Sequence, residues 1–394
     1  MPVPPRRPIK PASNPSHRRR PFRRNAILAR HAAARRLLAP TQFLESVGLN
    51  RNVSPYMGGI AGLQAALALL AAIVMVRHSV WPQLVGFAAL GALAALFGRF
   101  SPLARRHGIV WTCAALLTSA VFITSLASLL GASAEMVVLV VAFIAAASTV
   151  IFAWRKLDGP GAVIIVFAAG AAMTPVDSWA VLVERTLATA AGGTVAWLVT
   201  SATDFLRLPE LARVPAPVQP ARPWPNMLVA GVRIGIGAAV AALIAHAAGW
   251  NHPSWAAIGA TAVMQGGHLH VTMNRALQRM AGTLVGAMLV WMILAAEPPF
   301  WAIVAIIVIF QYVTEIIIGY NYALGQITVT PMALLMTYLA SPVATAAEMS
   351  IERVFDTMLG AVIGIVLALV FSTMDDRLHL AKHHRSRQTG GGVS

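Results

Sequence analysis

The chain has 394 residues, of which 58% are hydrophobic and 11% are charged. A water-soluble chain carries about 25% charged residues, so this composition excludes an ordinary soluble protein and predicts an all-α integral membrane protein. Apolar runs of about 20 residues recur, and such a run is long enough to cross a ~30 Å hydrocarbon core as a helix. The short alternating segments of a membrane barrel do not occur.

The first 56 residues (1–56) are predicted to form a basic, disordered cytoplasmic tail. Residues 1–51 hold twelve Lys and Arg and one acid, Glu45, so most of the formal net charge of +16 lies there. Segments rich in Pro, Ser and Arg bury too little apolar surface to fold. We expect this tail to contact anionic lipids of the cytoplasmic leaflet. We expect no nucleic acid as a partner, because no nucleic-acid-binding motif accompanies the charge.

Twelve apolar runs follow, in two groups of six. The first six-helix unit, residues 57–202, has predicted spans near 57–76, 81–98, 109–130, 136–154, 161–174 and 179–201. A polar, Pro-rich cytoplasmic linker is predicted at 203–226. The second six-helix unit, residues 227–373, has predicted spans near 227–248, 254–267, 280–296, 300–319, 321–340 and 350–373. A basic cytoplasmic tail is predicted at 374–394.

The distribution of basic residues predicts the orientation of these spans. Cytoplasmic loops of membrane proteins are enriched in Lys and Arg. With a cytoplasmic N-terminus, the even-numbered loops would face the cytoplasm, and these are the basic ones. They contain Arg99, Arg105, Arg106, Arg155, Lys156, Arg207, Arg213, Arg222, Arg275 and Arg279. Both termini are therefore predicted to be cytoplasmic.

The two units repeat weakly in sequence. His78, Trp81 and Arg105 recur in the second unit, all at one offset, as His252, Trp255 and Arg279. The segment "ERTLATAAGG" from Glu184 recurs as "ERVFDTMLGA" from Glu352, at a slightly shorter offset. Duplication of one six-helix unit explains both matches.

A shorter pattern, Arg-x3-Thr-x2-Gly, occurs three times. It is formed by Arg185, Thr189 and Gly192, by Arg279, Thr283 and Gly286, and by Arg353, Thr357 and Gly360. Positions i, i+4 and i+7 share one face of a helix. In the second unit the pattern opens the third span from the cytoplasmic side and the sixth from the outer side, as an inverted three-plus-three repeat would. Small residues at this spacing let helices approach closely, so Thr283, Gly286, Thr357 and Gly360 are interpreted as packing residues.

Charged residues within the spans are candidates for function, because a central charge costs about 2.5–3.5 kcal/mol on the insertion scale. Arg353 either pairs locally with Asp356 at the membrane interface or faces a water-filled path and binds an anion. Arg185 recurs at the same place in the first unit. Arg233 lies about two turns into its span, and Glu315 is deeply placed. These two either pair with each other or line a cavity.

Other polar residues predict no metal, cofactor or catalytic site. No acid or Cys joins His246, His252, His268 and His270 at ligand spacing. No P-loop motif occurs, and no set of nucleophile and base is assembled, so we expect no enzymatic activity. Trp255 belongs either to an interfacial aromatic belt or to a path for a ring-bearing substrate.

Three blocks of the second unit resemble a known family. They are "HPSWAAIGATAVMQGGHLHVTMNRALQRMAGTLVGAML", "YNYALGQITVTPMALL" and "IERVFDTMLGAVIGIVLAL". In order and spacing they are similar to the fusaric acid resistance protein-like (FUSC) family of the aromatic acid exporter superfamily. Residues 57–202 resemble it more loosely.

This resemblance implies a six-helix membrane unit, often duplicated, in bacterial inner-membrane exporters of small organic acids; a plant branch consists of anion channels. The positions that match the family's arginine blocks include Arg279 and Arg353, and Trp255 matches its tryptophan. Many members also carry a sizeable cytoplasmic domain, where this chain has only a linker.

The expected function is therefore export of small organic or aromatic carboxylate anions across the bacterial inner membrane, with a passive anion channel or a membrane scaffold as alternatives. Arg185, Arg233, Arg279, Arg353 and Trp255 are the candidate substrate-binding residues. Arginine keeps its proton, so any proton coupling is expected at Glu315 or Asp356. Assembly of the chain into a homo-oligomer is a further possibility.

Overall fold

The computed structural model describes residues 22–50, 54–99, 101–157, 159–207, 223–340 and 346–390, and within these ranges every regular element is a helix. The N-terminal part comprises α1 (Phe22–Leu37), α2 (Pro40–Val47), α3 (Pro55–Arg77), the 3-10 helix η1 (Pro82–Leu84), α4 (Val85–Ala92), η2 (Leu93–Leu96), α5 (Leu103–Leu129), α6 (Ala134–Arg155), α7 (Ala162–Ala171), α8 (Trp179–Ala202) and η3 (Asp204–Leu206). The C-terminal part comprises α10 (Trp224–Ala247), α11 (Pro253–Met264), α12 (Leu269–Ala295), α13 (Phe300–Ile317), α14 (Tyr322–Ala340), α15 (Ala346–Val370) and α16 (Met374–Gly390).

Local chemistry explains where several of these helices begin. The hydroxyls of Ser54, Ser133 and Ser178 each accept a hydrogen bond of 3.4 Å from the backbone N–H three positions later. They thereby cap α3, α6 and α8. Proline stands in the first turn of α3, α10 and α11, where its missing N–H costs no helical hydrogen bond.

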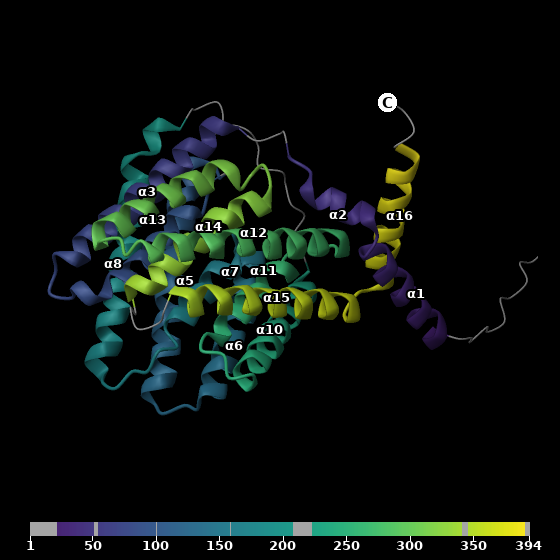
Figure 1. The fold of residues 1–394 in the computed structure, drawn as a ribbon, viewed down its shortest axis with the longest axis horizontal. Helices are drawn as coiled ribbons and strands as arrows, with labels where there is room; N and C mark the ends of the chain where they lie inside the picture. Colours follow the sequence, from purple (N-terminus) through teal and green to yellow (C-terminus); the bar gives the residue numbers. More distant parts are fainter. Residues whose placement is uncertain are drawn as a thin grey trace, which may run out of the picture.

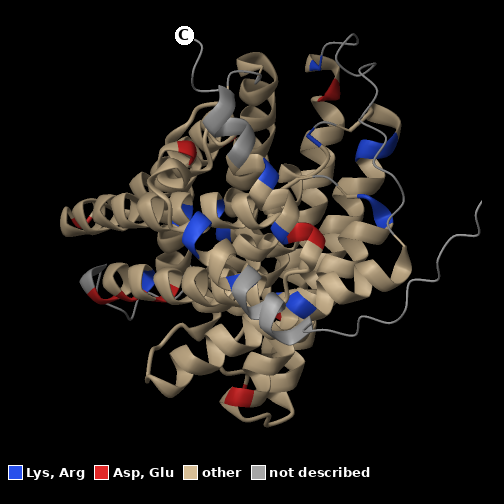
Figure 2. Ribbon diagram, turned by 90° about the vertical axis from the view of Figure 1, so that its right-hand side faces the viewer, with Lys and Arg blue, Asp and Glu red and all other residues tan. Residues whose placement is uncertain are grey.

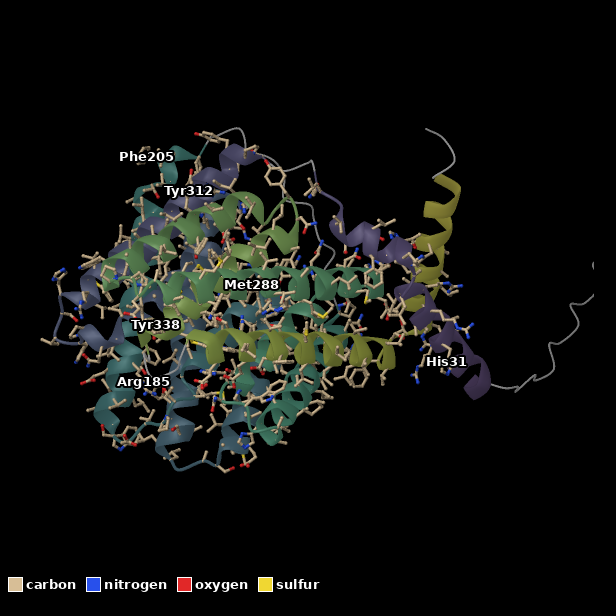
Figure 3. All side chains as sticks on the ribbon, viewed as in Figure 1. His31, Arg185, Phe205, Met288, Tyr312 and Tyr338 are labelled. Atoms are coloured by element: carbon tan, nitrogen blue, oxygen red, sulfur yellow. The ribbon has the colours of Figure 1, made fainter. Side chains whose placement is uncertain are left out.

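Within the described part of the chain, seven helices are long and apolar enough to cross a membrane: α3, α5, α6, α10, α12, α13 and α15. Large apolar side chains such as Phe143, Met288 and Trp291 are more than half exposed on these helices; Met288 is labelled in Figure 3. Such surface suits hydrocarbon rather than water. The prediction of an all-helical, multi-pass membrane protein is thus confirmed. All twelve predicted spans overlap helices, but only these seven have the length and composition of a span, and twelve crossings stay a prediction.

The second helix of each group is short and lies inside the molecule. Every residue of α4 is buried, and so is every residue of α11 up to Val263. A helix of 12 residues is about 18 Å long, so α11 is too short to cross a bilayer core. Both sequences are rich in Ala and Gly, which lets the surrounding helices approach closely.

The two groups of six helices make corresponding contacts (Figure 1). Within the groups, α4 packs on α8 as α11 packs on α15, and α5 packs on α7 and α8 as α12 packs on α14 and α15. Between the groups the contacts are reciprocal: α6 packs on α10 and α13 on α3, while α7 packs on α11 and α14 on α4.

The terminal helices pack together at one end of the molecule. Helix α1 contacts α15 and α16, and α2 contacts α12, and the end they form faces the viewer in Figure 2. The Arg30 guanidinium donates a hydrogen bond of 2.9 Å to the carbonyl of Val370. Residues 22–37 and 40–47 thus form helices where the sequence predicts disorder. Ala33 and Leu37 of α1 are buried against α12, α15 and α16, whereas α2 is held by polar contacts, in which the Gln42 amide bonds Asn274 and the Gln278 amide donates to the carbonyl of Ser46 on α2. Residues 1–21 lie outside the described residues.

Histidines connect α12 to α16 at this end. The rings of His268 and His379 stack with centroids 4.4 Å apart, and those of His270 and His383 stack at 4.2 Å. The His383 ring also lies 3.1 Å from a carboxylate oxygen of Glu45 on α2. His268 and His270 are therefore packing partners of α16 and not isolated polar loop residues.

Candidate functional site

Two buried arginines of the second group come close together. Arg279 on α12 is 3% exposed and Arg353 on α15 is 2% exposed, and each lies within electrostatic range of the other. The Arg279 guanidinium donates a hydrogen bond of 3.0 Å to the Tyr322 hydroxyl at the start of α14. The Arg353 guanidinium lies 5.1 Å from the centre of the Trp255 ring, on α11. Four helices thus contribute to one site.

Hydrogen-bonding groups of these arginines are left without partners. In the described part of the chain, Nε of Arg279 and both Nε and Nη1 of Arg353 are buried and make no hydrogen bond, and neither arginine has an ion pair within 4.0 Å. Leaving a buried charge without a partner costs about 3–5 kcal/mol. Planar guanidinium donors in this state match the oxygens of a carboxylate or another oxyanion.

Asp356 lies within electrostatic range of Arg353 but forms no ion pair with it among the described residues. The Asp356 side chain is fully buried, and within the described residues its two carboxylate oxygens make no hydrogen bond of ordinary geometry. The local pair of Arg353 with Asp356, one of the two alternatives from sequence, is therefore not formed as an ion pair. The carboxylate instead remains as a second charged or protonatable group one turn along α15 from Arg353.

Glu352 pairs with a residue that the sequence had not linked to it. Its carboxylate accepts a hydrogen bond of 2.7 Å from Nδ1 of His252, and it also bonds the backbone N–H groups of Asn251 and His252. The His252 ring stacks on Trp255 with centroids 4.2 Å apart and planes 8° from parallel. The sequence feature that indicates this ring contact is the His-x2-Trp spacing at the start of α11, which places both rings on one side of its first turn.

The glycines of the Arg-led pattern lie at helix crossings. A Cβ on Gly286 would come 2.7 Å from Cβ of Thr330 on α14. A Cβ on Gly360 would meet the backbone of α11, including the carbonyl of Ala256 and the Cα of Gly259. Thr283 and Thr357 are buried one turn before these glycines, at the same two crossings. These crossings set the distances between α12 and α14 and between α15 and α11, and hence the arginine positions.

Arg185 occupies the corresponding place in the first group but is differently bonded. Its guanidinium lies 5.3 Å from the centre of the Phe87 ring on α4, as Arg353 lies over Trp255. It donates hydrogen bonds of 3.0 and 3.1 Å to the carbonyls of Thr174 and Pro175, and Figure 3 shows it on α8 at a distance from the terminal helices. By contact, the counterpart of Trp255 in the first group is Phe87 and not Trp81.

Arg233 and Glu315 do not pair with each other. Arg233 is partly buried on α10 and makes no hydrogen bond or ion pair among the described residues. Glu315 lies near the end of α13, where its carboxylate forms an ion pair of 3.4 Å with Arg99, from the loop before α5. This pair joins the first group of helices to the second, so Glu315 forms an interhelical pair, but with Arg99 and not with Arg233.

A second buried polar cluster lies where the first group meets the linker. Arg106 donates to carboxylate Oδ1 of Asp204 and, over 2.6 Å, to the Gln64 side chain. Gln64 in turn donates to the Thr203 hydroxyl over 2.9 Å. Burial and the charge of Arg106 lower the pKa of the neighbouring Arg207. The sequence interpretation counted these arginines only as loop charges, because Asp204 and Gln64 are distant in the chain.

The fold and site define a helical multi-pass membrane protein whose C-terminal six helices carry two buried arginines that form no ion pair with the described residues. Residues 240–367 match the family described as fusaric acid resistance protein-like. This match confirms, for that segment, the resemblance found in the sequence blocks. The segment includes Trp255, Arg279 and Arg353 but not Arg185 or Arg233.

A curated relative supports the membrane assignment. The chain is 34% identical over 140 residues to the uncharacterized membrane protein YvaC of Bacillus subtilis (strain 168). The aligned region is 36% of this chain but only 22% of YvaC, so the chain spans about a fifth of that relative's length. No solved structure matches the chain.

Proposed function

We propose that the protein is a transporter that exports small organic anions, in particular aromatic carboxylates, across the bacterial inner membrane. The observation that carries this proposal is a pair of buried arginines, Arg279 and Arg353. Their free N–H groups make no hydrogen bond or ion pair with a carboxylate of the described residues, and Arg353 lies beside the ring of Trp255. An anion bound there would offset their charge, and an aromatic ring would add stacking on Trp255. A match to a fusaric acid resistance protein-like family points the same way.

The proposed architecture is twelve helices built from two six-helix units, residues 57–202 and 227–373, with the linker 203–226 and both terminal segments in the cytoplasm. The reciprocal packing of α6 on α10 and α13 on α3 supports an approximate two-fold relation between the units. Within the second unit, α11 packs on α15 as α14 packs on α12, which supports an inverted three-plus-three repeat. The basic N-terminal segment would contact anionic lipids, and two chains could form a homo-oligomer.

Proton coupling, if the export is coupled, is better placed at Asp356 than at Glu315. Asp356 lies one turn from Arg353 and makes no ion pair within the described ranges, whereas Glu315 is engaged by Arg99. A carboxyl group that releases its proton when an anion leaves Arg353, and takes a proton up when an anion binds, would keep the site's charge balanced.

The test is efflux from cells and uptake into everted vesicles, with a panel of benzoate, salicylate, fusaric acid and acetate. Arg353→Gln and Arg279→Gln should each abolish transport of the best panel member. Arg155→Gln is the matched control, because Arg155 also lies over an aromatic ring, that of Trp154, at 5.6 Å, but at the exposed end of α6. Equal transport by Arg353→Gln and the wild type would overturn the proposal. Currents that need no pH gradient would favour a passive channel.

A further inference from the structure

A hydrogen-bonded clamp fixes the start of α11 to α15. The carboxylate of Glu352 accepts bonds from the backbone N–H of His252, at 3.2 Å, and from Nδ1 of its ring, at 2.7 Å. The side chains of Glu352 and His252 are 12% and 27% exposed. Several bonds to one carboxylate leave it little freedom, so the imidazole is held in one orientation.

The clamped imidazole in turn holds the aromatic ring of the anion site. The His252 ring lies parallel to Trp255 at a centroid distance of 4.2 Å, and the Trp255 ring contacts the Arg353 guanidinium at 5.1 Å. Stacking and cation–π contacts both depend on ring orientation. A change at His252 would therefore reach Arg353 through Trp255, although no hydrogen bond or ion pair between described residues joins His252 to Arg353.

The first group of helices shows the same arrangement without the clamp. At the offset that aligns Arg185 with Arg353, Phe87 stands for Trp255 and Glu184 for Glu352. The helix begins at the same place, with Leu84 before α4 and His252 before α11. Leucine cannot bond a carboxylate, and there Arg185 binds the carbonyls of Thr174 and Pro175 instead of keeping free donors.

We propose that His252 and Glu352 are positioning residues of the anion site, which orient Trp255 so that the free N–H groups of Arg353 face the bound anion. This inference rests on the anion site proposed above. It also assigns anion binding to the second group of helices alone, because the first group has leucine in place of the histidine and an arginine that donates to two backbone carbonyls.

The experiment measures benzoate binding to the full chain in lipid nanodiscs and the ¹⁹F spectrum of the 5-fluorotryptophan-labelled protein, with Trp255→Phe to identify the Trp255 resonance. His252→Leu, which copies the first group, should weaken benzoate binding about tenfold, the loss of roughly one stacking contact, and shift or broaden the Trp255 resonance. Glu352→Gln keeps the His252 ring, and its amide oxygen can still accept from Nδ1 of His252, so it should keep binding within about threefold of wild type.

His246→Leu is the matched control. His246 lies 3.2 Å from the Glu135 carboxylate in another His–Glu pair, between α10 and α6, and makes no ring contact among the described residues. It should bind benzoate as the wild type does. An unchanged Trp255 resonance and unchanged binding in His252→Leu would overturn the clamp.

The Arg353→Gln variant distinguishes failure of the clamp from failure of the proposed anion site. If Arg353→Gln abolishes benzoate binding while His252→Leu leaves both readouts unchanged, the anion site stands and only the clamp is wrong. If Arg353→Gln and wild type bind benzoate equally, or neither binds it, the anion site is wrong for this probe, and the Trp255 resonance alone decides whether His252 positions the ring.

Discussion

Replacing Gly360 by alanine tests how closely α15 and α11 must approach. A Cβ at this position would meet the carbonyl oxygen of Ala256 first, and it would lie 2.9 Å from the backbone N of Ala260 and from the Cα of Gly259. Non-bonded carbon atoms prefer at least ~3.5 Å, so the contact with Gly259 alone would move α15 away from α11 by about 0.6 Å, and the closer contact with the Ala256 carbonyl requires a larger movement. The atoms that would be struck are backbone atoms of a buried helix, which cannot rotate aside as a side chain can.

The expected cost follows from two opposing effects. Overpacking of this kind costs about 1–3 kcal/mol, and the upper end applies because backbone meets backbone. Alanine in place of glycine inside a helix returns about 1 kcal/mol, which leaves a net loss of about 2 kcal/mol. The same movement would lengthen the contact between Arg353 and Trp255, so efflux should fall together with stability.

Gly108→Ala is the matched control, because nothing lies within 4 Å of a Cβ there. It should raise stability by about 1 kcal/mol, so the two variants should differ by about 3 kcal/mol. Thermal unfolding of the full chain in nanodiscs, followed by tryptophan fluorescence, measures this difference. If Gly360→Ala unfolds at the same temperature as Gly108→Ala and exports the best panel anion equally well, the close approach of α11 and α15 is not required.

Three further changes have defined outcomes. Asp204→Asn should destabilise the first group of helices by about 3–5 kcal/mol, because it leaves Arg106 buried without its charge partner. Urea or thermal unfolding measures this loss. Glu135→Gln is the control, because Glu135 belongs to an exposed pair, and it should have no measurable effect. Arg185→Gln should lower the unfolding temperature, since it removes two charged hydrogen bonds worth about 1.5–3 kcal/mol each, yet it should leave anion binding unchanged; lost binding would mean that the first group also holds a site. Burial and the charge of His383 lower the pKa of His384 below its ordinary 6.5. Arg36 acts in the same direction and Glu45 acts against it. The folded state therefore prefers the neutral ring. The docking of α16 should therefore be complete above pH 6.5 and weaken as the pH falls below 6.5. Hydrogen exchange of residues 374–384 at pH 7.5 and 5.5 measures the docking. Equal exchange in wild type and His384→Gln at both pH values would contradict the prediction.

The membrane class and the helix positions could be predicted from sequence because they depend on local properties. Runs of apolar residues, serine caps and proline at helix starts act within one segment. Helix lengths were predicted less well. The span expected near 280–296 is the second half of α12, which begins at Leu269, and the span expected near 81–98 is only partly the short helix α4.

The terminal segment shows a limit of composition as evidence. Residues 22–47 are basic enough to suggest disorder, but α1 and α2 find apolar and histidine partners on α12, α15 and α16. The stability of such helices comes from tertiary packing more than from propensity. The partners lie in the C-terminal half of the chain, and a composition argument about one segment does not include them.

The site was predicted residue by residue but not as a constellation. Arg279, Arg353 and Trp255 were candidates because each is costly or unusual in a membrane span. Which arginine is free and which is bonded could not be predicted, since Arg185 and Arg353 share the same local pattern and differ only in what their neighbours offer.

The sequence by itself determined that this chain enters a membrane as helices, which segments are apolar, and that three arginines lead glycine stripes, because hydropathy and spacing are properties of a single segment. Only the tertiary structure decided that Glu352 binds His252, that Glu315 binds Arg99, and that Arg279 and Arg353 approach each other with no ion-paired carboxylate among the described residues. These outcomes depend on how helices distant in the chain cross, and buried charges are paired or left unpaired at those crossings.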